Sequence, residues 1–166
     1  MKHNIVLTGI MGCGKTTIGK IVSEKLNMRF IDIDEYIEQM HGKISEIFLK
    51  GEDYFRNIEH NSVLDISKMH NVVIATGGGV VKRQDNINAL KKNGIIFFVD
   101  RPLDNILEDI DISERPLLKN GKKEIIKIFN ERYPLYKRTC DIHIVNTTTL
   151  NDAASSIIES WLSFYQ

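Results

Sequence analysis

Residues 9–16 have the sequence Gly9-Ile10-Met11-Gly12-Cys13-Gly14-Lys15-Thr16, which matches the pattern G-x-x-x-x-G-K-[ST] of a phosphate-binding loop. The loop follows the apolar run Ile5-Val6-Leu7 and precedes a segment with helical periodicity. Glycines lack a Cβ atom, so consecutive backbone N–H groups can curl around phosphate oxygens, and the start of the following helix attracts the same anion. An ordinary glycine-rich turn is the alternative, but the flanking elements favour a loop that binds a nucleoside triphosphate.

The end of this loop carries the chemically active side chains. Lys15 has the length to reach β- and γ-phosphate oxygens, and the Thr16 hydroxyl is the expected ligand of Mg²⁺. Cys13 lies inside the loop, where a small packing residue is a simpler interpretation than a reactive thiol. Cys140 is the only other cysteine, so the sequence does not indicate the disulfide framework of a secreted protein.

Length and composition indicate a single globular domain, residues 1–166, with 42% hydrophobic and 27% charged residues. Lys plus Arg and Asp plus Glu are both 22, so the broad positive field of most nucleic-acid-binding proteins is absent. The longest apolar run, residues 95–99, is too short for a membrane span, and the N-terminus lacks the pattern of a secretory signal. We therefore expect a cytoplasmic protein, monomeric, with no nucleic-acid or membrane partner.

Short apolar runs alternate with longer helical patterns, which is typical of parallel β-α-β units in an α/β fold. The expected strands are His3–Thr8, Arg29–Ile31, Asn71–Ala75, Ile95–Val99 and His143–Val145. The expected helices are Thr16–Asn27, Asp34–His41, Ile44–Leu49, Asp53–Lys68, Gln84–Asn93, Leu103–Ile110, Lys122–Lys137 and Asn151–Phe164. We expect Gly94 to end one helix in a left-handed conformation, and Lys25 and Leu162 to join the inward faces of two others. Trp161 is expected in the core, and Asp111–Lys123 is an expected mobile loop.

Asp32 and Asp34 end the second expected strand, where an open parallel sheet meets its ligand. Residues two apart in an extended chain share a face, so both carboxylates can enter one site. A helix N-cap at Asp34 is the alternative, but capping explains one aspartate and not two.

Four further stretches carry candidate groups. Arg56 and Glu59 lie one helical turn apart, and a surface ion pair is the simple interpretation. The glycine run Gly77-Gly78-Gly79 follows a strand and can bring backbone N–H groups close to a ligand. Arg115 in the expected loop could neutralise charge on a transferring phosphoryl group, and Arg132 with a second arginine suits a small hydroxy acid.

In their order and spacing these stretches resemble shikimate kinases over essentially the whole chain. The elements that carry the resemblance are Gly9–Thr17, Asp32-Ile33-Asp34, Phe55-Arg56-Asn57-Ile58-Glu59, Gly77-Gly78-Gly79, Arg115-Pro116-Leu117-Leu118 and Arg132-Tyr133-Pro134-Leu135-Tyr136. The resemblance implies a three-layer P-loop kinase fold with a five-stranded parallel sheet, helices on both faces and a mobile lid at about residues 111–123. It also implies a substrate-binding region at about residues 34–60, and transfer of the ATP γ-phosphoryl group to the 3-hydroxyl of shikimate on the route to chorismate.

The resemblance also implies residue roles. ATP and its phosphates would be bound by Gly12, Cys13, Gly14, Lys15, Thr16, Thr17 and Arg115. Mg²⁺ would be bound by Thr16 directly and by Asp32 through water, while Lys15, Asp34 and Arg115 would be the catalytic residues. Shikimate would be bound by Asp34, Arg56, Gly77, Gly78, Gly79 and Arg132, with the two arginines on its carboxylate.

Two positions depart from the pattern of this family. Glu108 stands where many members have an arginine that stacks on adenine, so that cation–π contact is not expected here. Asn57 replaces the second arginine of a frequent Phe-Arg-Arg sequence, although Arg56 is retained. The alternatives are a kinase for gluconate or a nucleotide, and a nucleotide-dependent switch. A switch of the GTPase type would need an Asn-Lys-x-Asp motif, which the sequence lacks.

Overall fold

The computed structural model describes residues 2–109 and 121–164, and its centre is a parallel five-stranded sheet in the order β2-β3-β1-β4-β5. The strands are β1 (Asn4–Thr8), β2 (Arg29–Asp32), β3 (Val72–Ala75), β4 (Gly94–Asp100) and β5 (Ile142–Val145). The expected parallel sheet is therefore confirmed. Because all strands run the same way, the segments that follow them meet at one edge of the sheet.

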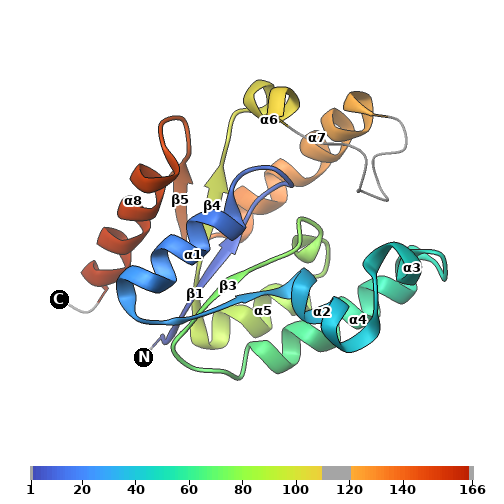
Figure 1. Cartoon of the computed structure of the whole chain (residues 1–166), viewed down its shortest axis with the longest axis horizontal. Coiled ribbons are helices and arrows are strands. Elements are labelled where there is room, and N and C mark those ends of the chain that lie inside the picture. Colours follow the sequence, from blue (N-terminus) through green and yellow to red (C-terminus); the bar gives the residue numbers. More distant parts are fainter. Residues whose placement is uncertain (1, 110–120, 165–166) are drawn as a thin grey trace.

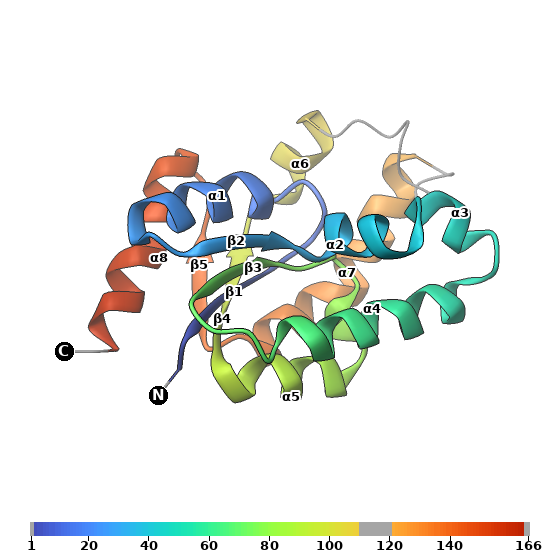
Figure 2. The same cartoon turned by 60° about the horizontal axis from the view of Figure 1, so that its bottom comes forward.

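Helices cover both faces of this sheet. They are α1 (Lys15–Leu26), α2 (Ile33–His41), α3 (Ile44–Phe48), α4 (Glu52–Ile66), α5 (Gln84–Asn93), α6 (Leu103–Asp109), α7 (Lys122–Thr139) and α8 (Leu150–Ser163), with a short 3₁₀ helix η1 (Val80–Lys82). Figure 1 shows α2, α3 and α4 together on one side of the molecule and α8 on the other. The turned view shows α1 and α8 on one face of the sheet and α4 and α5 on the opposite face (Figure 2).

The core lies along the central strands. β1 and β3 are buried over their whole length, and β4 is buried up to Val99. Continuous apolar strands of this kind form where helices cover both faces of a parallel sheet. The expected strands and helices are all present, with described ends that differ from the expected ones by no more than two residues. Trp161 is 8% exposed and packs in the core as expected.

Three local expectations are wrong. Gly94 is extended, with φ −124°, because α5 passes directly into β4 there. A Cβ atom at Gly94 would lie 2.8 Å from Val6 Cγ2, so close strand packing rather than a left-handed turn requires the glycine. Leu162 is 47% exposed and Lys25 is also exposed, because the buried faces of α8 and α1 are narrower than the faces expected from the sequence.

Within residues 2–109 and 121–164, none of the helices combines the length and the apolar composition that a membrane span needs. Arg115 and most of the expected lid fall outside these residues. Of the expected lid, the structure describes Gly121, with φ 66°, and Lys122 and Lys123, which begin α7.

Candidate active site

The phosphate-binding loop connects β1 to α1 and has the backbone conformation that its glycines allow. Gly12 and Gly14 have φ values of 78° and 100°, a region that favours glycine. The Lys15 ammonium folds back over the loop and donates to the carbonyl oxygens of Gly9 at 2.8 Å and Ile10 at 2.9 Å. Cys13 is fully buried within the loop, as expected for a small packing residue.

Two side chains from neighbouring strand ends hold the outer carbonyls of this loop. Arg101, after β4, donates from Nη1 to the Gly12 oxygen at 3.0 Å, and Asn146, after β5, donates from Nδ2 to the Cys13 oxygen at 3.0 Å. Asn146 is buried. Neither residue was predicted from the sequence, although each lies directly after a strand, which was an available signal.

Asp32 links the phosphate-binding loop to the end of β2. Its Oδ2 accepts a hydrogen bond of 2.8 Å from the Thr16 hydroxyl, and its Oδ1 accepts one of 2.9 Å from the Asp34 backbone N–H. Asp32 is therefore the N-cap of α2, and the alternative that placed this cap at Asp34 is wrong. The capping bond fixes a carboxylate oxygen beside the Thr16 hydroxyl.

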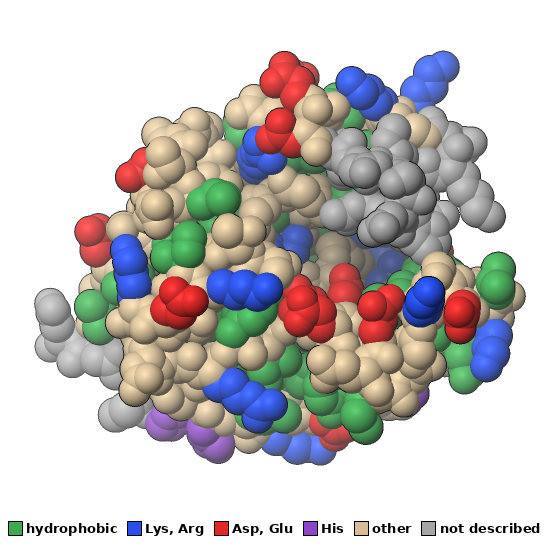
Figure 3. All heavy atoms as spheres, in the orientation of Figure 1, with side chains coloured by type: hydrophobic (Ala, Val, Ile, Leu, Met, Phe, Trp, Pro, Cys, Tyr) green, Lys and Arg blue, Asp and Glu red, His purple; other side chains and the backbone are tan. Residues whose placement is uncertain are grey.

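A cavity of about 370 Å³ lies beside the loop, a volume suited to a small molecule. Figure 3 shows this face of the molecule hollowed, with basic side chains inside the hollow and acidic ones along its rim. The cavity is lined by Met11, Asp34, Glu38, Ile44, Ser45, Phe48, Phe55, Arg56, Glu59, Gly77, Gly78, Gly79 and Arg132. The fold thus brings Asp34, both predicted arginines and the glycine run into one space beside the phosphate-binding loop.

Arg56 enters this cavity from α4 between two carboxylates. Its Nη1 donates to Glu59 Oε2 at 2.8 Å, while its Nε and Nη2 donate to Glu52 Oε1 at 3.2 Å. Lys82 also donates to Glu52, at 2.9 Å. Glu59 is 1% exposed, so the interpretation of Arg56 and Glu59 as a surface ion pair is wrong.

Burial and charge act against each other in this group. Burial raises the pKa of Glu59, although the neighbouring Arg56 guanidinium favours the ionised carboxylate. Burial disfavours the charge of Arg56, but Glu59 and Glu52 outweigh it and raise the pKa of this guanidinium. The hydrogen bond from Lys82 is the main cause of the lowered pKa of Glu52. Arg56 is thus held as a cation.

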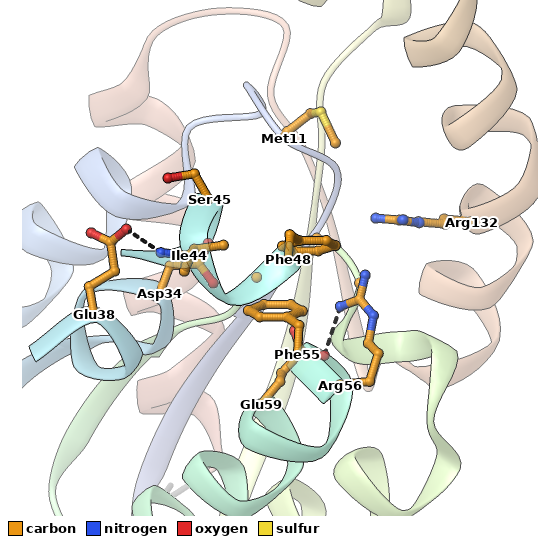
Figure 4. A pocket seen from close by; sticks show the side chains of 13 residues that line it. Met11, Asp34, Glu38, Ile44, Ser45, Phe48, Phe55, Arg56, Glu59 and Arg132 are labelled. Atoms are coloured by element: carbon orange, nitrogen blue, oxygen red, sulfur yellow. Dashed lines mark hydrogen bonds and ion pairs between the residues drawn. The ribbon is translucent and has the colours of Figure 1, made fainter. Parts of the chain in front are cut away.

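Arg132 reaches the same cavity from α7, on the opposite side (Figure 4). The residue is only 4% exposed, and its Nε has no hydrogen-bond partner among the described residues. The Oε1 atom of Glu59 is also buried and has no hydrogen-bond partner among the described residues. Buried polar atoms of this kind carry a free-energy cost until a ligand or water satisfies them.

The glycine run forms the wall of the cavity between these arginines. A Cβ atom at Gly79 would overlap the Arg56 guanidinium, and one at Gly77 would lie 2.8 Å from Asp34 Oδ1. A side chain at either position would therefore displace Arg56 or Asp34 from its present place in the cavity. Among residues 2–109 and 121–164, no backbone carbonyl accepts from the N–H groups of Gly77, Gly78 and Gly79, so a ligand in the cavity can use these donors.

Comparison with known proteins assigns this arrangement to a family. The family model described as shikimate kinase matches residues 11–162. The chain belongs to the shikimate kinase family. A shikimate kinase of Clostridium botulinum (strain Eklund 17B / Type B) is 52% identical over 158 residues, which are 95% of this chain and 96% of the relative.

Solved shikimate kinases have the same fold. The shikimate kinase from Acinetobacter baumannii, in complex with shikimate, has a TM-score of 0.91 and 33% identity, covering 98% of this chain and 94% of that chain. The shikimate kinase from Aquifex aeolicus vf5 has a TM-score of 0.85 and 37% identity, covering 98% of both chains. The expected P-loop kinase architecture is therefore confirmed for the described residues.

The two departures from the shikimate kinase pattern lie away from the cavity. Asn57 accepts a hydrogen bond of 3.3 Å from Arg83 on the exposed side of α4. An asparagine in place of the frequent second arginine therefore leaves the cavity lining unchanged. Glu108 is exposed on α6. Arg101 is a cation next to the phosphate-binding loop, and it also pairs with Asp109 at the end of α6.

Proposed function

We propose that this chain transfers the γ-phosphoryl group of ATP to the 3-hydroxyl of shikimate. The observation that carries the proposal is the convergence of Arg56 and Arg132, from two helices, on one small cavity next to a phosphate-binding loop. A guanidinium binds a carboxylate through paired hydrogen bonds, and shikimate carries one carboxylate on a small ring. The complex named for the Acinetobacter relative supports the same acceptor.

Arg132 and Arg56 hold the carboxylate in this proposal. Arg132 lines the cavity and is only 4% exposed, so an anion bound there pairs with a largely desolvated guanidinium. Arg56 is already fixed by Glu52 and Glu59, which reduces the conformational entropy that it loses on binding. The N–H groups of the glycine run and the Asp34 carboxylate then contact the hydroxyl groups.

ATP binds through the phosphate-binding loop, with Lys15 and the N–H groups of residues 12–17 on its phosphates. The Lys15 ammonium lies at the mouth of the loop, where hydrogen bonds to two carbonyls hold it. Burial of this cation at the site strengthens its attraction for phosphate oxygens. Asn146 and Arg101 support the loop from behind and keep its N–H groups directed at the anion.

Thr16 and Asp32 fit Mg²⁺ as the metal of the proposal. Both offer oxygen atoms, which Mg²⁺ prefers, and they lie 2.8 Å apart. The described residues contain no group of three or more His, Cys, Asp or Glu side chains that could hold a metal ion by itself. Thr16 would bind the ion directly and Asp32 through water, and the ion would supply positive charge to neutralise the phosphates.

The transfer itself needs positioning and neutralisation of charge more than covalent participation. Asp34 lies against Gly77 in the cavity wall, where it aligns the attacking hydroxyl and can accept its proton. Lys15 neutralises charge on the transferring group from the opposite side. Arg115 is assigned a second neutralising role with the lid at residues 111–123; hydrogen exchange there should slow when ATP and shikimate bind.

The proposal includes a single-domain, cytoplasmic, monomeric enzyme with residues 34–60 as its acceptor-binding region. Light scattering after size-exclusion chromatography tests the monomer. Gluconate and nucleotides are the competing acceptors, but the cavity offers a carboxylate clamp without an added base pocket. The test is product identification: incubation with Mg·ATP and shikimate should give a ³¹P resonance coupled to the proton at carbon 3. Phosphorylation of gluconate or a nucleotide in preference to shikimate would refute the assignment.

A further inference from the structure

The carbonyl group of Gly78 is held differently from those of its two neighbours. The Gly77 oxygen accepts from the Val80 N–H at 3.2 Å, and the Gly79 oxygen accepts from the Lys82 N–H at 3.0 Å. Both bonds are local turns that lead into η1. The Gly78 oxygen instead accepts from the hydroxyl of Tyr136, at 2.5 Å, so a side chain of α7 controls the middle of the glycine run.

Tyr136 is itself rigidly placed. It is 1% exposed, and its ring stacks on Phe98 of β4 with centroids 5.2 Å apart and planes at 22°. Burial raises the pKa of Tyr136, although the nearby Arg132 acts in the opposite direction. The phenol therefore stays protonated over the working pH range and remains a donor. Tyr136 does not line the cavity, so it can act on a ligand only through other groups.

Those other groups lie at the meeting point of the two halves of the site. A Cβ atom on Gly78 would lie 3.5 Å from Met11 N of the phosphate-binding loop and 3.6 Å from Arg132 Nη1. Gly79 lies against the Arg56 guanidinium. A trans peptide unit is planar, so a fixed Gly78 carbonyl also fixes the Gly79 N–H on the opposite side of the same plane.

We propose that Tyr136 is a positioning residue, whose hydroxyl fixes the Gly78–Gly79 peptide so that the Gly79 N–H donates to the bound acceptor. The inference rests on the proposed function, because it needs the acceptor in this cavity. Without the hydroxyl, the partly buried Gly78 carbonyl loses its partner, and the peptide can rotate away from the binding orientation.

The test is Tyr136→Phe, which removes one oxygen and keeps the ring. We expect KM for shikimate to rise about tenfold, the effect of one lost hydrogen bond, while KM for ATP changes less than twofold. The matched control is Tyr133→Phe. Tyr133 lies on the same helix and donates to Asp100 Oδ2 at 2.8 Å, away from the cavity lining, so its variant should keep both constants.

The two KM values separate positioning from a purely structural role. If Tyr136→Phe lowers the melting temperature and leaves KM for shikimate unchanged below that temperature, the inference is overturned. Arg132→Ala, assayed in parallel, separates the inference from the proposed function. An impaired Arg132→Ala beside a normal Tyr136→Phe rejects only the inference, whereas normal shikimate binding by Arg132→Ala rejects the proposed site.

A measurement on the unmodified chain covers the case in which Tyr136→Phe does not fold. In ¹H–¹⁵N spectra, saturation with shikimate should move the Gly79 amide proton downfield, as expected for a new hydrogen bond. The Gly94 amide, buried between α5 and β4, is the internal reference. A Gly79 resonance that shifts no more than that of Gly94 would contradict the proposed donor.

Discussion

Arg132 illustrates how a residue acquires its function from burial. The side chain is charged, 4% exposed and, within the described residues, without a partner for its Nε. Such a group is tolerated where a ligand completes its hydrogen bonds. Arg56 differs, because two glutamates already hold it. The two arginines therefore make different contributions. Arg56 is held in place by two glutamates before the ligand binds, whereas Arg132 gains its charged partner from the anion.

Arg132→Ala should raise KM for shikimate about 100-fold and change KM for ATP less than threefold, since loss of a buried charged partner costs about 2–3 kcal/mol. Arg56→Ala should act in the same direction. Arg138→Ala, an exposed change on the same helix as Arg132, is the control and should keep both constants. Steady-state kinetics measures all three variants. An equal rise in KM for shikimate and for ATP would contradict the assignment of the two arginines to the carboxylate.

The carboxylates around Arg56 make a prediction about pH. Burial raises the pKa of Glu59 in the folded state, so the folded chain favours its protonated form and loses stability as pH rises from about 4.5 through the raised value. The free energy of unfolding of the wild type, minus that of Glu59→Gln, should fall as pH rises above about 4.5. Urea denaturation at a series of pH values measures it.

Glu52 provides the opposite sign for comparison. Its pKa is lowered, chiefly by the hydrogen bond from Lys82, so its contribution to stability is present above about pH 4.5 and is lost as pH falls. The corresponding difference for Glu52→Gln should therefore rise with pH below 4.5. If both differences changed in the same direction with pH, burial would not be the main effect on Glu59, or pairing with Lys82 would not be the main effect on Glu52.

The phosphate-binding loop is the element on which the donor side depends. Lys15→Ala should lower kcat at least 100-fold, because the ammonium is the charge that the loop directs at the transferring phosphoryl group. The far-ultraviolet circular dichroism spectrum should not change, since the loop backbone is set by its glycines. A variant that turns over at a nearly wild-type rate would show that the loop does not carry the donor.

Asn146 supports the phosphate-binding loop, so its loss should affect ATP more than shikimate. Asn146→Ala leaves the Cys13 carbonyl without its 3.0 Å hydrogen bond and should raise KM for ATP about five- to tenfold. KM for shikimate should stay within twofold, because Asn146 does not line the acceptor cavity. Asn151→Ala, an exposed change at the start of α8, is the control. A larger effect on shikimate than on ATP would contradict this division.

For the whole molecule, the sequence predicted the sheet because strands depend on local patterns. The resemblance to shikimate kinases named many of the residues that line the cavity. Apolar runs set the strands, and the glycine pattern set the loop. Burial was less predictable: Arg56 and Glu59 have the spacing of a surface pair, and only the packing of α4 against α2 and the glycine run buries them. Arg101, Asn146 and Tyr136 act on backbone groups far away in sequence. A position after a strand or within a motif therefore did not reveal which carbonyl each side chain holds.

The central claim is that donor and acceptor meet between the phosphate-binding loop and the Arg56–Arg132 cavity. Its most direct test is ADP release from Mg·ATP, measured in a coupled assay with and without shikimate. We predict release that depends on shikimate, saturates with it, and is not stimulated by gluconate or nucleoside monophosphates. ADP release at the same slow rate with and without shikimate would contradict the account.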